Sequence, residues 1–263
     1  MAQIHPTAIV DDNAQIADSV KIGPYCVVGA HVVLGENVEL KSHVVVEGHT
    51  QIGAGTVIYP FASIGHAPQD LKFRGEESRL IIGENNTIRE HVTMNPGTKD
   101  GAMETVIGNK NLFMMATHVA HDCIIGNNVI MANNATLGGH VEVGNNVLVG
   151  GLSAVHQFVK IGDFAVIGGM SGVESDVIPY GRVKGERAFL AGLNLIGLER
   201  SGFNKEQIKQ MQRAYGELFS GAGTLNERLA YVEESYTESP EINKIIAFAK
   251  AERHFALCQP QKK

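Results

Sequence analysis

Aliphatic residues recur along this chain at a spacing of six. Every sixth position from Ile4 to Ile64 is Ile, Leu or Val, and a small or β-branched residue stands two positions before most of them. A period of six fits neither an α-helix nor one simple strand, so it indicates an internal repeat. We interpret it as a triangular β-helix in which each face carries one six-residue unit and each unit points one aliphatic side chain inward.

The repeat survives two interruptions. The aliphatic positions after Ile64 keep their phase up to Met94, across a predicted loop at 65–81. Beyond a second predicted loop at 95–106, the spacing resumes and runs to Val173. Three units per coil give about nine to ten coils, stacked at the spacing of roughly 4.8 Å that separates neighbouring strands. The expected fold class is therefore mainly β, a parallel β-helix of hexapeptide repeats.

After Val173 the six-residue spacing is lost and the pattern becomes helical. Leucine spacing predicts one helix, and capping signals or an N-terminal proline predict three more. Their expected starts lie near Ala188, at Asn204 with Gln207, at Thr224 with Glu227, and at Ser239 with Pro240. We thus expect a β-helix domain over 1–187 and a C-terminal α-helical domain over 188–263, which would cover the open edge of the last coil.

Composition narrows the class of protein. No apolar run approaches the ~18 residues of a membrane span, and acidic residues follow too soon for a signal peptide, so we expect a cytoplasmic protein. The net charge of −6 argues against non-specific nucleic-acid binding. Three cysteines at unrelated spacings, Cys26, Cys123 and Cys258, are interpreted as reduced core thiols.

Histidines supply the candidate chemistry. His118, His121, His140 and His156 fall close together, and Asp122 follows His121 directly. In coils of about 18 residues, His121, His140 and His156 are expected to stack along one edge. Three interpretations stay open from the residues alone: surface histidines without a role, a zinc site between subunits, or a general base with Asp122 beside it.

Several strings resemble one family. They are HVAHD, NNATLGGHV, AVHQF and GGMSGV, preceded by QDLKFRGE in the first predicted loop. Together they resemble the hexapeptide-repeat UDP-N-acetylglucosamine acyltransferases that begin lipid A synthesis, over nearly the whole chain. The resemblance implies a left-handed β-helix and transfer of an (R)-3-hydroxyacyl chain from acyl carrier protein to the 3-hydroxyl of UDP-N-acetylglucosamine.

The resemblance also implies roles for individual residues. His121 matches the general base, Asp122 the acid that orients it, and Gly139 the glycine whose N–H meets the developing oxyanion. Gly169 matches the acyl-chain ruler, where glycine permits chains of about twelve to fourteen carbons. The implied substrate contacts are Gln69, Asp70, Lys72, His118, His140, His156, Gln157, Asn194 and Arg200.

Four neighbouring positions depart from the family pattern. They are Asn95, Arg187, Ile196 and Ser201, where a His, a His, a Glu and an Arg are expected. The implied partners are acylated acyl carrier protein, UDP-N-acetylglucosamine and two further copies in a homotrimer, with no cofactor or metal. A basic patch for the acidic carrier protein is expected among Lys160, Arg182, Lys184, Arg187 and Arg200.

Three alternatives remain from the sequence. The nearest is an N-acyltransferase that acts on an already acylated UDP-glucosamine. A zinc carbonic anhydrase-like β-helix would use histidines that converge between subunits. A non-catalytic β-helix scaffold would leave the histidine cluster free to change without consequence.

Overall fold

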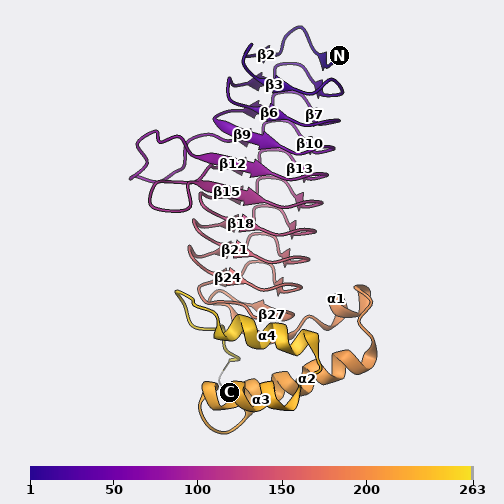
Figure 1. Cartoon of the computed structure of the whole chain (residues 1–263), viewed down its shortest axis with the longest axis vertical. Coiled ribbons are helices and arrows are strands. Elements are labelled where there is room, and N and C mark those ends of the chain that lie inside the picture. Colours follow the sequence, from indigo (N-terminus) through magenta and orange to yellow (C-terminus); the bar gives the residue numbers. More distant parts are fainter. Residues whose placement is uncertain (262–263) are drawn as a thin grey trace.

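A computed structural model describes residues 1–261 as a long column of stacked three-sided coils with helices at its C-terminal end (Figure 1). The column is a left-handed parallel β-helix, as the six-residue spacing and the family resemblance predict. Each coil contributes one short strand to each of three parallel sheets. Because strands pair only with the coils above and below, the fold grows as a rod rather than as a globule.

The three sheets run the length of the rod. One contains β1 Gln3–Ile4, β4 Lys21–Ile22, β7 Glu39–Leu40, β10 Val57–Ile58, β13 Thr87–Ile88, β16 Leu112–Phe113, β19 Ile130–Met131, β22 Leu148–Val149, β25 Val166–Ile167, β27 Gly181–Lys184 and β28 Phe189–Leu193. The second contains β2 Ile9–Val10, β5 Val27–Val28, β8 Val45–Val46, β11 Ser63–Ile64, β14 Thr93–Met94, β17 His118–Val119, β20 Thr136–Leu137, β23 Ala154–Val155 and β26 Gly172–Val173. The third contains β3 Gln15–Ile16, β6 Val33–Leu34, β9 His49–Ile52, β12 Arg79–Ile82, β15 Glu104–Ile107, β18 Ile124–Ile125, β21 Glu142–Val143 and β24 Lys160–Ile161.

The inward positions form one continuous apolar core. Val119, Leu137, Val149 and Ile167 are fully buried, as the six-residue register predicts. The corners between faces are tight, and many corner residues other than glycine adopt the left-handed backbone conformation with φ near +60°. The corner that follows the second sheet holds Asp122, whose φ of +58° turns the chain immediately after His121.

Both predicted loops end earlier than expected. Strand β12 begins at Arg79 and strand β15 at Glu104, so the loops span 65–78 and 95–103 rather than 65–81 and 95–106. The reason is that β9, β12 and β15 are four residues long and pair along their whole length. The aliphatic spacing marks only the last residue of each strand, so it did not reveal the added pairs.

The C-terminal segment begins with a strand, which corrects the helix expected from Ala188. Residues Phe189–Leu193 form β28, which pairs antiparallel with β27, and the register of the pair shifts between Gly181 and Val183. Leu190 and Leu193 are buried in this arrangement. The unpaired edge of the last coil is the physical reason, because its backbone N–H and C=O groups need partners.

Four helices follow β28. They are α1 Leu195–Arg200, α2 Lys205–Ser220, α3 Leu225–Ser235 and α4 Pro240–Lys250. Asn204 with Gln207, and Thr224 with Glu227, form the two predicted capping boxes, and Ser239 caps α4. The segment after α4 returns to the β-helix, where Asp176 and Leu257 form a parallel bridge. Within residues 1–261, every helix is too short or too polar to cross a membrane. The three cysteines are buried free thiols that form no disulfide within these residues.

Candidate active site

The predicted histidine pair lies where the second sheet turns into the third. His118 begins β17, Val119 points into the core, and His121 and Asp122 form the corner that leads to β18. The left-handed conformation of Asp122 is one that Asp tolerates better than most residues. It sends the carboxylate under the neighbouring loop, while the His121 side chain keeps 16% of its surface exposed.

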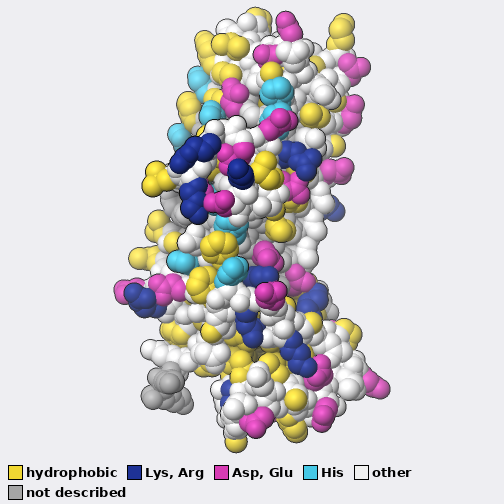
Figure 2. Space-filling view, turned by 60° about the vertical axis from the view of Figure 1, so that its left-hand side comes forward, with side chains coloured by type: hydrophobic (Ala, Val, Ile, Leu, Met, Phe, Trp, Pro, Cys, Tyr) yellow, Lys and Arg dark blue, Asp and Glu magenta, His cyan; other side chains and the backbone are white. Residues whose placement is uncertain are grey.

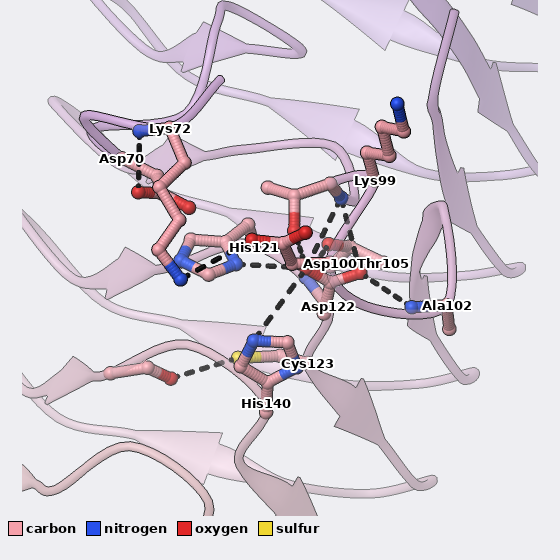
Figure 3. A network of polar contacts seen from close by, with 12 residues as sticks. Asp70, Lys72, Lys99, Asp100, Ala102, Thr105, His121, Asp122, Cys123 and His140 are labelled. Carbon is pink, nitrogen blue, oxygen red and sulfur yellow. Dashed lines mark hydrogen bonds and ion pairs between the residues drawn. The ribbon is translucent and has the colours of Figure 1, made fainter. Parts of the chain in front are cut away.

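Asp122 is surrounded by hydrogen-bond donors. Its carboxylate accepts from Nδ1 of His121 at 2.8 Å and from the Thr98 hydroxyl at 2.6 Å, both at Oδ2. The Thr98 N–H lies 3.1 Å from both oxygens, and the Ala102 N–H donates to Oδ1 at 2.9 Å. Figure 3 shows these bonds converging on the carboxylate, whose side chain is 1% exposed. Burial would raise the pKa of Asp122, but the bonds from His121 and Thr98 outweigh it and hold this pKa below its ordinary value.

The contact with Asp122 fixes how His121 can act. Because Nδ1 donates to the carboxylate, Nε2 is left as the acceptor of the neutral ring. The carboxylate also stabilises the imidazolium that forms when Nε2 takes a proton. The pair therefore has the arrangement of a general base with its orienting acid.

Gly139 lies directly under the imidazole. A Cβ at this position would stand 2.5 Å from Cε1 and 2.7 Å from Nε2 of His121, so a side chain here would displace the ring. The Gly139 carbonyl accepts from the Phe158 N–H one coil further along. Within residues 1–261 the Gly139 N–H itself has no hydrogen-bond acceptor, so a donor remains beside Nε2.

His140 completes the cluster from the next coil. Its ring meets that of His121 edge to face with centroids 5.1 Å apart, and its Nε2 lies 4.0 Å from Oδ2 of Asp122. Burial, and to a lesser degree the charge of His121, lowers the pKa of His140, while Asp122 opposes that shift. His118 lies on the other side, where its Nδ1 is 2.7 Å from the Thr93 hydroxyl and burial lowers its pKa.

The two loops meet over this corner. Figure 3 places Asp70 and Lys72 of the first loop beside His121, and Nζ of Lys72 pairs with Asp100 of the second loop at 3.2 Å. A cavity of about 340 Å³ lies between the loops, lined by Asp70, Lys72, Arg74, Gly75, Glu76, Thr98, Lys99 and Asp100. Lysine and arginine side chains gather on this part of the surface, with histidines above and below (Figure 2).

Comparisons with known proteins show the family of this chain. Residues 176–256 match the family model for domain 2 of UDP-N-acetylglucosamine O-acyltransferase, and 1–36 and 104–139 match the bacterial transferase hexapeptide model. An acyl-acyl-carrier-protein–UDP-N-acetylglucosamine O-acyltransferase from Caulobacter vibrioides is 53% identical, over 98% of both chains. The chain belongs to the UDP-N-acetylglucosamine O-acyltransferase family.

Solved structures of this acyltransferase family share the whole fold. A structure from Acinetobacter baumannii superposes with a TM-score of 0.92 at 43% identity, covering 96% of this chain and 99% of its own. The UDP-N-acetylglucosamine acyltransferase of Francisella novicida reaches a TM-score of 0.96 at 34% identity, covering 99% and 95%. The β-helix and its helical end are therefore common to these proteins.

The remaining predicted contacts do not all join the cluster. His156 lies edge to face with Phe255, and Phe158 rather than His156 stacks under His140, with centroids 4.4 Å apart. The expected column of His121, His140 and His156 is therefore wrong at its third member, because a corner repeats every 18 residues and 140 is followed by 158. Gln157 stands on the same corner as His121 and Gly139.

Asn194 and Arg200 belong to the helical end of the rod. Asn194 caps α1 and donates to the Phe164 carbonyl, and Arg200 closes the same helix. Strands β21 and β24 lie between β18 and the level of this helix along the long axis (Figure 1). Within one chain these two residues thus lie apart from His121.

The four departures from the family pattern have separate surroundings. Asn95 is buried and donates to the His66 and Ala67 carbonyls, so it fastens the first loop. Arg187 pairs with Glu174, Ile196 is exposed, and Ser201 ends α1. None of these contacts touches Asp122 or His121.

Sequence reasoning missed the donors that enclose Asp122. Thr98 and Ala102 sit in the second loop, about twenty residues earlier, where no periodic signal relates them to the corner. The hydroxyl oxygen of Thr105, in β15 of the preceding coil, accepts a hydrogen bond from the Asp122 N–H at 2.8 Å. The only sequence signal for the second loop was the interruption of the six-residue aliphatic spacing.

These donors also bear on the zinc alternative. Ligand atoms of His121, Asp122 and His140 lie within 4.8 Å of one another, a spacing that a metal site requires. Both carboxylate oxygens, however, already accept hydrogen bonds from buried Thr98, and Oδ1 also accepts from the Ala102 N–H. The arrangement favours a hydrogen-bonded acid and base over a metal centre, because a metal would have to displace these bonds.

Proposed function

We propose that this protein transfers an (R)-3-hydroxyacyl chain from acyl carrier protein to the 3-hydroxyl of UDP-N-acetylglucosamine, the first step of lipid A biosynthesis. The observation that carries the proposal is the His121–Asp122 pair at a β-helix corner, with Gly139 directly beneath the imidazole. An alcohol is a poor nucleophile at neutral pH, so the reaction needs a positioned base of this kind.

The geometry supports a two-step acyl transfer. Nε2 of His121 removes the proton of the 3-hydroxyl while the sugar oxygen forms a bond to the thioester carbonyl carbon. The N–H of Gly139 stabilises the negative charge that develops on the carbonyl oxygen. The C–S bond then breaks, and the carrier thiolate leaves with the proton held by His121. Asp122 keeps the imidazolium oriented throughout and is not itself protonated.

Substrate contacts are assigned around this centre. Gln69, Asp70 and Lys72 approach from the first loop toward the sugar nucleotide, and His118 and His140 flank the base. His156 and Gln157 follow β23, one coil beyond Gly139, at the corner between the second and third sheets. Gly169 follows β25 in the next coil, at the corner between the first and second sheets. No cofactor enters this scheme, since the thioester arrives already activated.

The placement of Asn194 and Arg200 supports a homotrimer. As nucleotide contacts they need a His121 corner within reach, and α1 of a neighbouring copy could supply them there. Flat-sided rods pack readily about a threefold axis. We place the trimer in the cytoplasm, with its carrier-protein surface near Arg182 and Lys184, because Lys160 and Arg187 are already paired with Glu142 and Glu174.

The test is an acyl-transfer assay of purified protein with UDP-N-acetylglucosamine and (R)-3-hydroxyacyl carrier proteins. Replacing His121 by Ala should lower kcat by about 10²–10⁴-fold, the usual range for loss of a general base, with folding intact. His43→Ala is the matched control, since His43 occupies a left-handed corner on another edge and should leave kcat unchanged. Retention of more than about a tenth of activity in His121→Ala would exclude the proposed base. Activity only toward an acylated UDP-glucosamine would favour the N-acyltransferase.

A further inference from the structure

The second loop is fitted to a single carboxylate. Residues 95–103 leave the coil between β14 and β15 and close over Asp122. Thr98 is 2% exposed, and all its polar contacts through the N–H and hydroxyl go to that carboxylate. A Cβ on Gly101 would overlap the same group, so the loop follows its outline closely.

The loop is held in this shape from behind. The Gly97 N–H donates to the Arg79 carbonyl at 3.2 Å, and the Thr98 carbonyl accepts from the Gly101 and Met103 N–H groups. The Lys99 N–H donates to Glu76 of the first loop at 3.0 Å. These bonds hold the Thr98 N–H and hydroxyl in position to donate to the Asp122 carboxylate.

We propose that Thr98 is a positioning residue for the acyl transfer, because its hydroxyl shares Oδ2 of Asp122 with Nδ1 of His121. This inference rests on the proposed role of His121 as general base. The hydroxyl at 2.6 Å and the imidazole at 2.8 Å approach one oxygen. The first bond fixes where that oxygen stands, and so decides the direction and strength of the second.

The role predicts an effect on turnover and little effect on binding. Thr98 lines the same cavity as the proposed contacts Asp70 and Lys72, but its N–H and hydroxyl are both bonded to Asp122, so it reaches the reaction only through Asp122 and His121. Without the hydroxyl, Oδ2 loses a donor that holds the pKa of Asp122 low, so the acid–base pair keeps its proton to higher pH. The other charged or titratable groups near the pair, which the variant leaves in place, are His118, His140, Asp70, Lys72 and Asp100. The Lys99 side chain points away from the pair (Figure 3).

The experiment compares three variants of the full-length protein. Thr98→Val removes the hydroxyl but keeps the shape, and should lower kcat about tenfold while the KM for UDP-N-acetylglucosamine stays within about twofold. The acidic limb of its kcat/KM profile should move to higher pH. Thr98→Ser restores the hydroxyl and should recover most of kcat. Thr56→Val is the control, since Thr56 is an equally buried threonine at another corner, bonded to the Gly83 carbonyl.

Each outcome decides the matter. An unchanged kcat and pH profile in Thr98→Val, or a Thr98→Ser variant as slow as Thr98→Val, would overturn the role. Should Thr98→Val be insoluble, Thr98→Ala takes its place, and equal rates in the Ala and Ser variants would refute the role as firmly. If His121→Ala is inactive and Thr98→Val is normal, only this inference fails; if His121→Ala is active, the proposed function itself fails.

Discussion

The corner residues must both adopt the left-handed backbone conformation of a turn and place their side chains in the site. Asp122 and His140 have φ values of +58° and +60°, a conformation that costs most residues about 1 kcal/mol or more. The same conformation directs Asp122 beneath the second loop and places His140 edge to face with His121. Gly139, between two such corners, has no room for a side chain under the imidazole. Backbone geometry and site chemistry are thus coupled at single residues.

The acyl-chain ruler is also tested at the residue scale. Gly169 sits at an exposed corner, where a Cβ would lie 3.3 Å from the Gly151 carbonyl oxygen, so a side chain needs only a small shift and points outward. Gly169→Met should fold and should move the preferred donor from about twelve to fourteen carbons toward ten. Each buried methylene contributes about 0.8 kcal/mol, so two carbons change kcat/KM by roughly tenfold or more.

Competition between acyl carrier proteins of different chain length measures this shift. The KM for UDP-N-acetylglucosamine should stay within about twofold of the parent, because the ruler does not contact the sugar nucleotide. Gly151→Ala, one coil earlier, is the matched control, because it adds only one methyl group and should leave the chain-length preference unchanged. A chain-length profile that Gly169→Met leaves unaltered would place the ruler elsewhere.

At the scale of the element, the two-residue strands from β4 onward place one side chain in the core and the other toward the surface. In β22, Val149 is fully buried and its neighbour Leu148 is 40% exposed. The coils above and below pair with both residues in the same register. Because Val149 faces the core and Leu148 faces the surface, a charged side chain should prevent folding at the first position and be tolerated at the second.

Val149→Asp should prevent soluble folding, since it buries a carboxylate among aliphatic side chains with no partner. Leu148→Asp places the same side chain on the outer face and should leave a folded β-helix. Circular dichroism and thermal unfolding of the two variants measure the difference. A Val149→Asp protein that melts with the parent would contradict the inward register.

For the whole molecule, the junction between the rod and the helices depends on a polar ladder. Asn109, Asn127 and Asn145 each donate to the side chain of the next coil, and Asp163 ends the series. Lys244 of α4 donates to Asp163 at 2.7 Å. Burial would raise the pKa of Asp163, but the bonds from Lys244 and Asn145 outweigh it and keep this pKa below its ordinary value.

A lowered folded-state pKa gives the pH dependence its sign. The unfolded Asp titrates near pH ~3.9, so the stabilisation from Asp163 is fully present above about pH 4 and is lost as pH falls through the lower folded value. Asp163→Asn should reduce the free energy of unfolding by about 0.5–1 kcal/mol at pH 7, a modest figure because Lys244 is half-exposed. The difference from the parent should shrink as the pH falls below about 4.

Urea unfolding at several pH values measures this difference. Lys244→Met should give a similar loss at pH 7, whereas Lys209→Met, at an exposed position of α2, should give none at any pH. A difference that grows as the pH falls would contradict the sign, and with it the contribution assigned to the Asp163–Lys244 pair.

The sequence alone determined most of the rod. A six-residue spacing of aliphatic side chains is satisfied by few structures, since each inward position must meet the same position in the coils above and below. It therefore predicted the β-helix, its core and the number of coils. The strings around His121, Asp122 and Gly139 located the corner, because these residues are neighbours in one coil or stand one coil apart.

The tertiary structure decided the features that the six-residue spacing does not encode. The spacing of Leu190, Leu193 and Leu198 predicts a helix, but residues 189–193 form a strand because they pair with the unpaired edge of β27. Thr98 has no periodic relation to Asp122, so only the folded loop shows that they share hydrogen bonds. Periodicity reports contacts repeated in every coil, whereas a contact made once, by a loop or a chain end, depends on the path of the whole chain.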